Sequence, residues 1–107
     1  MEQYLHICKI MIVISKTILV NFGLKNSDSI VALNKWYDLT KKADWNNLSE
    51  MKKSFNTVDY VGNDRYVFNI GGNKYRLVVM MFFNIRTMYI RFIGTHAEYN
   101  KIDCTKI

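Results

Sequence analysis

DRYVFNIGGNKYRLVVMMFFNIRTMYIRFIG, residues 64–94, is the stretch of this 107-residue chain that decides its fold. Apolar residues alternate with polar ones along much of it, and Gly71-Gly72 and the segment around Ile85-Arg86 interrupt the alternation. A period of two indicates β-strands, and such interruptions indicate the turns between them. The stretch therefore predicts an antiparallel meander of three strands, from Arg65 to Ile70, Asn73 to Phe83 and Thr87 to Ile93.

The N-terminal half predicts helices behind one short strand. Residues 11–15 (MIVIS) are apolar and β-branched, which predicts a strand, and Ser15 can cap a helix from Lys16 to about Gly23. Residues 26–42 predict an amphipathic helix that ends in Lys41 and Lys42, and residues 46–55 predict a short helix from Leu48 to Phe55, capped by Asn47. We expect an α+β fold, an antiparallel sheet with these helices packed on one face.

Composition and charge limit the possible functions. Fifteen Lys and Arg against nine Asp and Glu give a formal net charge of +6 at pH 7, which favours nucleic acid or an acidic protein as partner. The chain has no proline and no linker-like run, so residues 1–107 are expected to form one domain. Lys9 and Lys16 interrupt the apolar N-terminal stretch, so we expect no membrane segment and a cytoplasmic protein. Cys8 and Cys104 lie outside any metal-ligand spacing and are expected to be free thiols.

The predicted register separates an apolar face of the sheet from a basic one. A two-residue turn at Gly71-Gly72 pairs Ile70 with Asn73, and an even-length second turn pairs Met80 with Arg91. The expected core face comprises Tyr66, Phe68, Ile70, Tyr75, Leu77, Val79, Met81, Ile90 and Phe92. The opposite face comprises Arg65, Val67, Asn69, Lys74, Arg76, Val78, Met80, Tyr89, Arg91, Ile93 and Thr95. Because this second face carries no carboxylate, it predicts an uncovered cationic surface where Arg76 and Arg91 hold one phosphate.

The stretch GTHAEY, residues 94–99, follows the last predicted strand. Thr95 and Glu98 have the Thr-x-x-Glu spacing of a capping box, which predicts a short C-terminal helix and a structural role for Glu98. His96 then lies at the first helical position, where free backbone N–H groups attract anions, and Tyr99 lies one turn later on the same side. Taken singly, His96 could be merely exposed and Tyr99 merely packed against the sheet.

These residue types suit RNA cleavage without a metal. Such cleavage needs a base for the 2′-OH, cations for the charge that gathers on the phosphate, and an acid for the leaving 5′-oxygen. Arg76 and Arg91 suit the cationic role, and His96, Tyr99 and Lys74 are candidates for the proton transfers. The sequence has no Gly-rich phosphate loop before a helix, no pair of carboxylates suited to acid catalysis and no metal-ligand cluster, so no cofactor or metal is expected. Candidate RNA-binding residues are Arg65, Asn69, Lys74, Lys41 and Lys42, of which the last two could equally be a solvated helix end.

Two motifs resemble a known family. VGNDRYVFNIGGNKYRLVV (residues 61–79) and YIRFIGTHAEYNKID (residues 89–103), with MIVISK and WYDLTKKADW upstream, are similar to the HigB toxins of the RelE/ParE superfamily. The resemblance spans about Met11 to Asp103 and implies a RelE-like fold. Family members usually begin near Met11, so residues 1–10 are expected to be an N-terminal extension. Asn100 stands where the family usually has Asp.

The resemblance implies the toxin of a type II toxin-antitoxin module, an mRNA endoribonuclease that typically acts on translating ribosomes. It also implies a HigA-type helix-turn-helix antitoxin, through which the complex would bind operator DNA. Carried over to this sequence, the site residues are Arg76, Arg91, His96 and Tyr99. Two alternatives remain, a toxin that binds DNA gyrase without cleaving RNA and a plain RNA-binding module, and the four site residues favour the nuclease over both.

Overall fold

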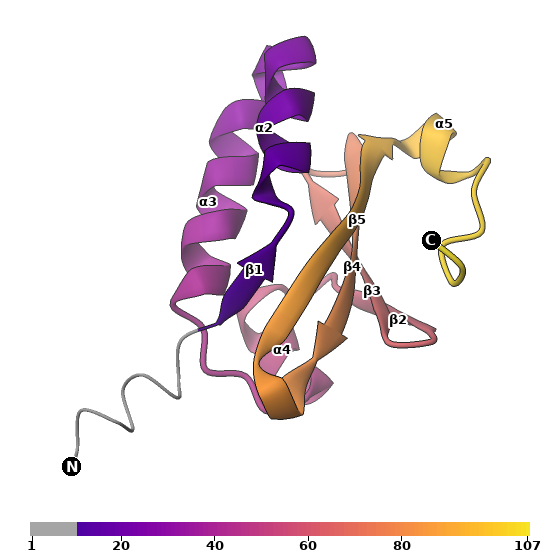
Figure 1. The fold of residues 1–107 in the computed structure, drawn as a ribbon. Helices are drawn as coiled ribbons and strands as arrows, with labels where there is room; N and C mark the ends of the chain where they lie inside the picture. Colours follow the sequence, from indigo (N-terminus) through magenta and orange to yellow (C-terminus); the bar gives the residue numbers. More distant parts are fainter. Residues whose placement is uncertain (1–10) are drawn as a thin grey trace.

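The computed structural model describes residues 11–107 (Figure 1). The predicted N-terminal extension and Cys8 lie outside this range. Five strands form one sheet in the order β1-β5-β4-β3-β2, and they are β1 (Ile12–Ile14), β2 (Asp59–Gly62), β3 (Arg65–Ile70), β4 (Tyr75–Phe82) and β5 (Thr87–Thr95). The helices are α2 (Lys16–Lys25), α3 (Ile30–Lys41), α4 (Leu48–Ser54) and α5 (His96–Tyr99), with short 3-10 turns at Ser27–Ser29 and Phe83–Ile85. The predicted α+β class is confirmed.

The sheet is larger than predicted and is not wholly antiparallel. β1 runs parallel to β5, with Ile12 beside Thr87. β2 pairs antiparallel with β3 and adds a fourth strand to the meander, which the sequence analysis missed. A tight turn joins β2 to β3, where Asn63 and Asp64 both have left-handed backbone (φ 50° and 63°). β2 therefore becomes the edge of the sheet opposite β1.

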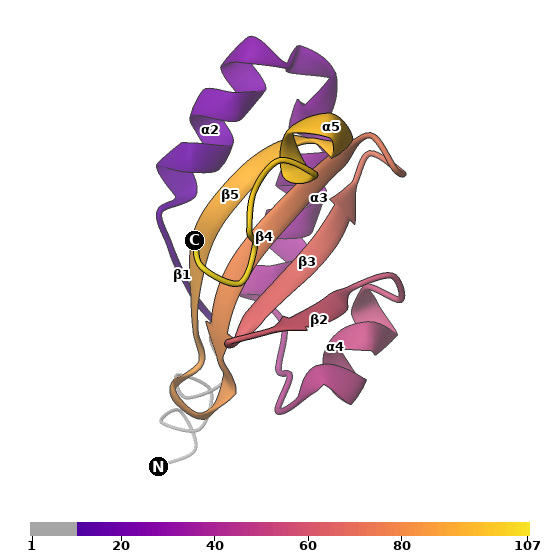
Figure 2. The same cartoon turned by 90° about the vertical axis from the view of Figure 1, so that its right-hand side faces the viewer.

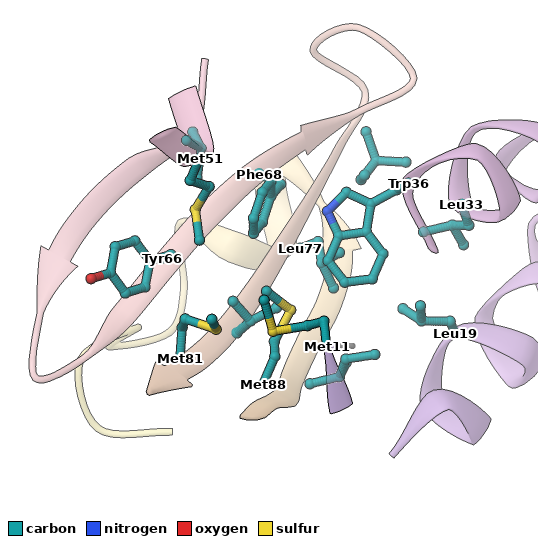
Figure 3. Close-up of a cluster of buried hydrophobic side chains, with 14 of the residues drawn as sticks. Met11, Leu19, Leu33, Trp36, Met51, Tyr66, Phe68, Leu77, Met81 and Met88 are labelled. Carbon is teal, nitrogen blue, oxygen red and sulfur yellow. The ribbon is translucent and has the colours of Figure 1, made fainter. Parts of the chain in front are cut away.

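The main core lies between the sheet and the helices α2 and α3 (Figure 3). Leu33 and Trp36 follow the predicted apolar stripe of α3, and both are buried. Figure 3 shows them facing the sheet, and the ring of Trp36 meets that of Phe68 edge to face with centroids 5.4 Å apart. Burial of these large rings removes much apolar surface from water, so this contact fixes α3 on the sheet.

Two details of α2 differ from prediction. The helix continues past Gly23 to Lys25. Gly23 is buried, and a Cβ at this position would lie 3.0 Å from Cγ1 of Ile30, so the glycine allows α2 and α3 to approach closely instead of ending the helix. Ser15 has left-handed backbone (φ 74°) and its side chain makes no capping hydrogen bond. The predicted cap of α4 is confirmed, since the Glu50 amide donates to Asn47 Oδ1 over 3.0 Å.

The first hairpin has a four-residue turn rather than the predicted two-residue turn. Ile70 pairs with Tyr75, and Asn69 with Arg76. Relative to the prediction, the pairing has moved by two residues. Because side chains alternate with a period of two, this shift leaves the residues of β3 and β4 on their predicted faces.

The second hairpin contains a bulge that the sequence analysis missed. Val79 pairs with Ile90, but its neighbour Val78 pairs with Phe92, so Arg91 is the extra residue. The bulge reverses the alternation that follows it. Phe92 therefore belongs to the face opposite the helices, whereas Ile93 packs against the main core.

The face of the sheet opposite α2 and α3 is not uncovered as predicted. Figure 2 shows α5 and the C-terminal segment, residues 100–107, lying in front of β4 and β5. Val67 and Val78 belong to this face and are only 6% and 0% exposed. The small apolar side chains at its centre are covered, which explains how a C-terminal segment without regular structure is held against the sheet.

Candidate functional site

The candidate site lies where β4, β5 and α5 meet, on the face that carries the C-terminal segment (Figure 2). Arg76 of β4 pairs with Gly94 of β5, and Arg91 lies at the bulge beside Val78. From strand spacing and rise, the Cα atoms of Arg76 and Arg91 are about 10 Å apart, closer than the unbulged register predicts. The bulge thus brings the two arginines nearer to each other.

The capping box predicted for α5 is present. The amide of Glu98 donates to Thr95 Oγ1 over 3.1 Å, and the amide of Thr95 donates to Glu98 Oε1 over 2.8 Å. Gly94 makes room for this arrangement, because a Cβ there would lie 2.6 Å from Cζ of Phe92 and 2.9 Å from Glu98 Oε1. A helix of four residues is too short to be stable by itself, so these contacts hold His96 and Tyr99 in place.

His96 is exposed at the first position of α5. Its Nδ1 lies 3.1 Å from the side-chain nitrogen of Asn100. An amide nitrogen can only donate, so this contact fits the neutral imidazole tautomer with its proton on Nε2. In that form His96 presents an N–H donor at Nε2.

Tyr99 is half-buried, and its hydroxyl donates to Cys104 Sγ over 3.4 Å. Burial is the main cause that raises the pKa of Tyr99 to about 12, followed by Cys104 and by the negative charge of Asp59. The positive charge of Arg76 acts in the opposite direction. At neutral pH the phenol carries its proton, as an ordinary tyrosine also does, so it suits the role of proton donor rather than base. Cys104 carries a free thiol, as predicted.

The two arginines differ in their surroundings. Arg76 Nη1 donates to the carbonyl oxygens of Asn73, over 3.0 Å, and Tyr75, over 3.3 Å. Arg91 is exposed. A guanidinium has five N–H donors, so Arg76 can keep these backbone contacts and still donate to an anion. Arg76 is thus held in position by its own hairpin, whereas no hydrogen bond or ion pair within residues 11–107 fixes the guanidinium of Arg91.

Lys74 and Arg65 have partners within the protein. Lys74 Nζ forms an ion pair with the carboxylate of Asp28, which also accepts from the Tyr75 hydroxyl at 2.6 Å. The contact with Asp28 raises the pKa of Lys74, so its ammonium does not suit the role of base. Arg65 Nε donates to the carbonyl of Ile107 over 3.0 Å, and so ties the C-terminal segment to β3.

The remaining RNA-binding candidates lie in different parts of the molecule. Asn69 pairs with Arg76 across β3 and β4, and its amide contacts Asn73 Oδ1 at 3.4 Å. Lys41 and Lys42 end α3, in the helical layer on the other side of the sheet (Figure 1). The structure therefore groups Asn69 with the candidate site and leaves these two lysines apart from it.

Asp59 is a residue of this face that the sequence analysis missed. It belongs to β2 and pairs with Val67, so the face does carry a carboxylate. The β-branched and aromatic residues of VDYVG, residues 58–62, were the available signal for this strand. The site is accordingly of mixed charge rather than purely cationic.

Comparison with known proteins places the chain in a family. Residues 29–102 match the family model HigB_toxin, described as the RelE-like toxic component of a toxin-antitoxin system. The chain belongs to this family. The mRNA interferase HigB of Escherichia coli O6:H1 strain CFT073 is 30% identical over 92 residues, which cover 84% of this chain and 89% of that protein. The mRNA interferase toxin HigB of Escherichia coli K12 is 54% identical over 35 residues, 33% of this chain and 34% of that protein.

The family assignment confirms the resemblance predicted from the two sheet motifs. As the toxic component of a toxin-antitoxin system, this HigB-family chain has an antitoxin as its partner. Between residues 11 and 107, no helix is long and apolar enough to cross a membrane. In the same part of the chain, His, Cys, Asp and Glu form no group of three or more that could hold a metal ion.

Proposed function

We propose that this HigB-family toxin is an mRNA interferase that cleaves the phosphodiester backbone through the 2′-OH of its RNA substrate. The names of its relatives support this function. The observation that carries it is the pairing of Arg76 with Gly94, which places this cation next to the start of α5, the helix that carries His96 and the phenol of Tyr99. A proton donor beside a cation is what departure of an alkoxide from a phosphate requires.

In this reaction the 2′-oxygen forms a bond to phosphorus, and the bond from phosphorus to the 5′-oxygen breaks. Arg76 and Arg91 stabilise the negative charge that develops on the phosphate oxygens. Tyr99 gives its proton to the leaving 5′-oxygen, and His96 Nε2–H donates to a neighbouring phosphate oxygen. The products are a 2′,3′-cyclic phosphate and a 5′-hydroxyl. DNA lacks the 2′-OH and would be bound without being cut.

The RNA-binding candidates Asn69, Lys41 and Lys42 can all contact RNA if the protein acts on the ribosome. Asn69 neighbours Arg76 and can contact the nucleotide next to the scissile phosphate. Lys41 and Lys42 face away from that strand of RNA, since they end a helix of the opposite layer. Ribosomal RNA can approach from more than one side, so we propose that these lysines contact it while the mRNA occupies the site.

The proposed antitoxin is a HigA-type helix-turn-helix protein. Membership of a toxin-antitoxin family supports an antitoxin, and the net charge of +6 suits an acidic binding surface on it. Operator DNA would be bound only through the complex. Co-expression of the chain with a neighbouring helix-turn-helix protein should restore growth, and the two should purify together.

Mapping of transcript 5′ ends after brief induction tests the nuclease. The wild type should arrest growth and create new 5′ ends within coding regions. Arg76→Ala and Tyr99→Phe should abolish both effects while the proteins stay folded, as judged by circular dichroism. Growth arrest with intact mRNA would refute the proposal. DNA breaks in place of RNA ends would indicate a gyrase poison, and RNA binding without shortening would indicate a plain binding module.

A further inference from the structure

Asp59 is an exposed carboxylate on the same face of the sheet as the candidate site. No ion pair or hydrogen bond of its side chain occurs within residues 11–107. The other acidic residues near the site do have such contacts: Glu98 accepts from the Thr95 amide, and Asp103 accepts from Thr105. Asp59 therefore has no structural contact that would account for its charge at this position.

The sheet register fixes where Asp59 lies relative to Arg76. Asp59 pairs with Val67, and Val67 pairs with Val78, so these three residues form one row across β2, β3 and β4. Arg76 lies on β4 two residues from Val78, on the same face. From strand spacing and rise, the Cα atoms of Asp59 and Arg76 are about 12 Å apart. A nucleotide spans a comparable distance, so a ribose and its phosphate could be contacted by both side chains at once.

Tyr99 lies within range of both charges. The carboxylate of Asp59 raises the pKa of Tyr99, and the guanidinium of Arg76 lowers it. The register places the carboxylate and the guanidinium on the face of the sheet that α5 covers (Figure 2), so the phenol of Tyr99 lies near the same face, although the three groups come from β2, β4 and α5. Cleavage of RNA needs a proton acceptor, a cation and a proton donor in one place, and these three groups can supply them.

Other groups suit the acceptor role less well. Tyr99 and Lys74 have raised pKa values, so both keep their protons at neutral pH. His96 Nδ1 is already a hydrogen-bond acceptor for Asn100. A carboxylate without a partner has free lone pairs for the hydrogen of a 2′-OH.

We propose that Asp59 is the general base of the cleavage reaction. This assignment rests on the proposed function as an RNA-cleaving toxin. The proton of the 2′-OH moves to a carboxylate oxygen of Asp59 as the 2′-oxygen bonds to phosphorus. The bond to the 5′-oxygen breaks, and that oxygen takes the proton of Tyr99, so atoms and charges balance with no further reactant.

Asp59→Asn tests the assignment, because it keeps the shape of the side chain and removes the basic oxygen. Its matched control is Asp64→Asn, which removes the same charge from the exposed turn that follows β2. On mRNA bound to ribosomes, Asp59→Asn should lower the single-turnover cleavage rate about 100-fold or more, the range expected for a general base. Asp64→Asn should stay within about twofold of the wild type. Equal rates for Asp59→Asn and the wild type would overturn the assignment.

A substrate with a sulfur in place of the leaving 5′-oxygen separates a base from an acid. Sulfur leaves without protonation, so cleavage by Tyr99→Phe should be largely restored with this RNA. Cleavage by Asp59→Asn should remain slow, because the 2′-OH still needs its base. Restoration of Asp59→Asn by the sulfur substrate would overturn the assignment.

Binding and folding controls separate chemistry from structural damage. Both Asn variants should bind an RNA with 2′-deoxyribose at the cleavage site as tightly as the wild type does, and should melt at the same temperature. A loss of binding in Asp59→Asn that matches its loss of rate would overturn the role of base. If the wild type itself leaves RNA intact, the proposed function fails and the assignment of Asp59 falls with it.

Discussion

Loss of the Thr95 hydroxyl should slow cleavage because α5 becomes less ordered, and not because Thr95 takes part in the reaction. Thr95→Ala removes the acceptor of the Glu98 amide, a 3.1 Å hydrogen bond. Loss of such a cap costs about 1 kcal/mol, and every 1.4 kcal/mol is tenfold, so the ratio of formed to frayed helix falls about fivefold. Because α5 has only four residues, it has no interior to compensate. His96 and Tyr99 are correctly placed only while it is formed, so the cleavage rate should fall by up to about fivefold.

Single-turnover cleavage of ribosome-bound mRNA is the assay, with Thr95→Ser as the matched control because it keeps the oxygen. Thr95→Ser should cleave within about twofold of the wild type. The loss is local, so the melting midpoint of Thr95→Ala should fall by less than about 4 °C. A hundredfold loss of rate would refute this reasoning, because it would place Thr95 in the reaction itself. Equal losses of cleavage rate in Thr95→Ala and Thr95→Ser would also refute it, because the serine keeps the capping oxygen.

Three further predictions concern the same end of the molecule. The raised pKa of Tyr99 means that the folded state keeps the phenol proton longer than the unfolded state, so its stabilising contribution is complete below pH 10 and is lost between pH 10 and about 12. Urea unfolding across this range should show a loss of unfolding free energy in the wild type that exceeds the loss in Tyr99→Phe. Lys74→Ala should leave cleavage within about twofold and should hardly change the urea midpoint of unfolding, because the Lys74–Asp28 pair is exposed to solvent. A tenfold loss of rate would mean that Lys74 takes part in catalysis. Gly94→Ala should destabilise the protein by about 1–3 kcal/mol in the same assay, because the new methyl group would collide with the Phe92 ring, and an unchanged stability would show that the ring moves freely.

The strands were predictable because alternation is a local property, whereas the register was not. Gly71 and Gly72 both have left-handed backbone, as a tight turn requires, but the turn also includes Asn73 and Lys74. A turn longer by two residues moves the pairing by two and leaves each residue on the same face. The sorting of polar from apolar residues therefore cannot distinguish the two registers, and the faces were right although the pairs were wrong.

The bulge at Arg91 had no signal in the alternation. Phe92 and Ile93 are both large and apolar, so either one fits the core face. Only the pairing of β4 with β5 decides which of them turns inward. The partners of Arg65 and Lys74 could not be predicted either, because they lie 42 and 46 residues away in sequence. The capping box of α5, by contrast, spans four residues and was predicted from spacing alone.

Some of the basic residues predicted for this face have partners within the protein, and this changes what the charge of the face implies for function. A surface of unpaired cations would bind any polyanion and favour a plain RNA-binding module. In the structure Arg65 and Lys74 are bound to other parts of the protein, and β2 adds the carboxylate of Asp59. A carboxylate repels phosphate, so it weakens simple binding, and its presence on the same face as Arg76 is better explained by proton transfer. The mixed charge of the site therefore favours a nuclease over a binding module, an inference that the number of basic residues alone does not provide.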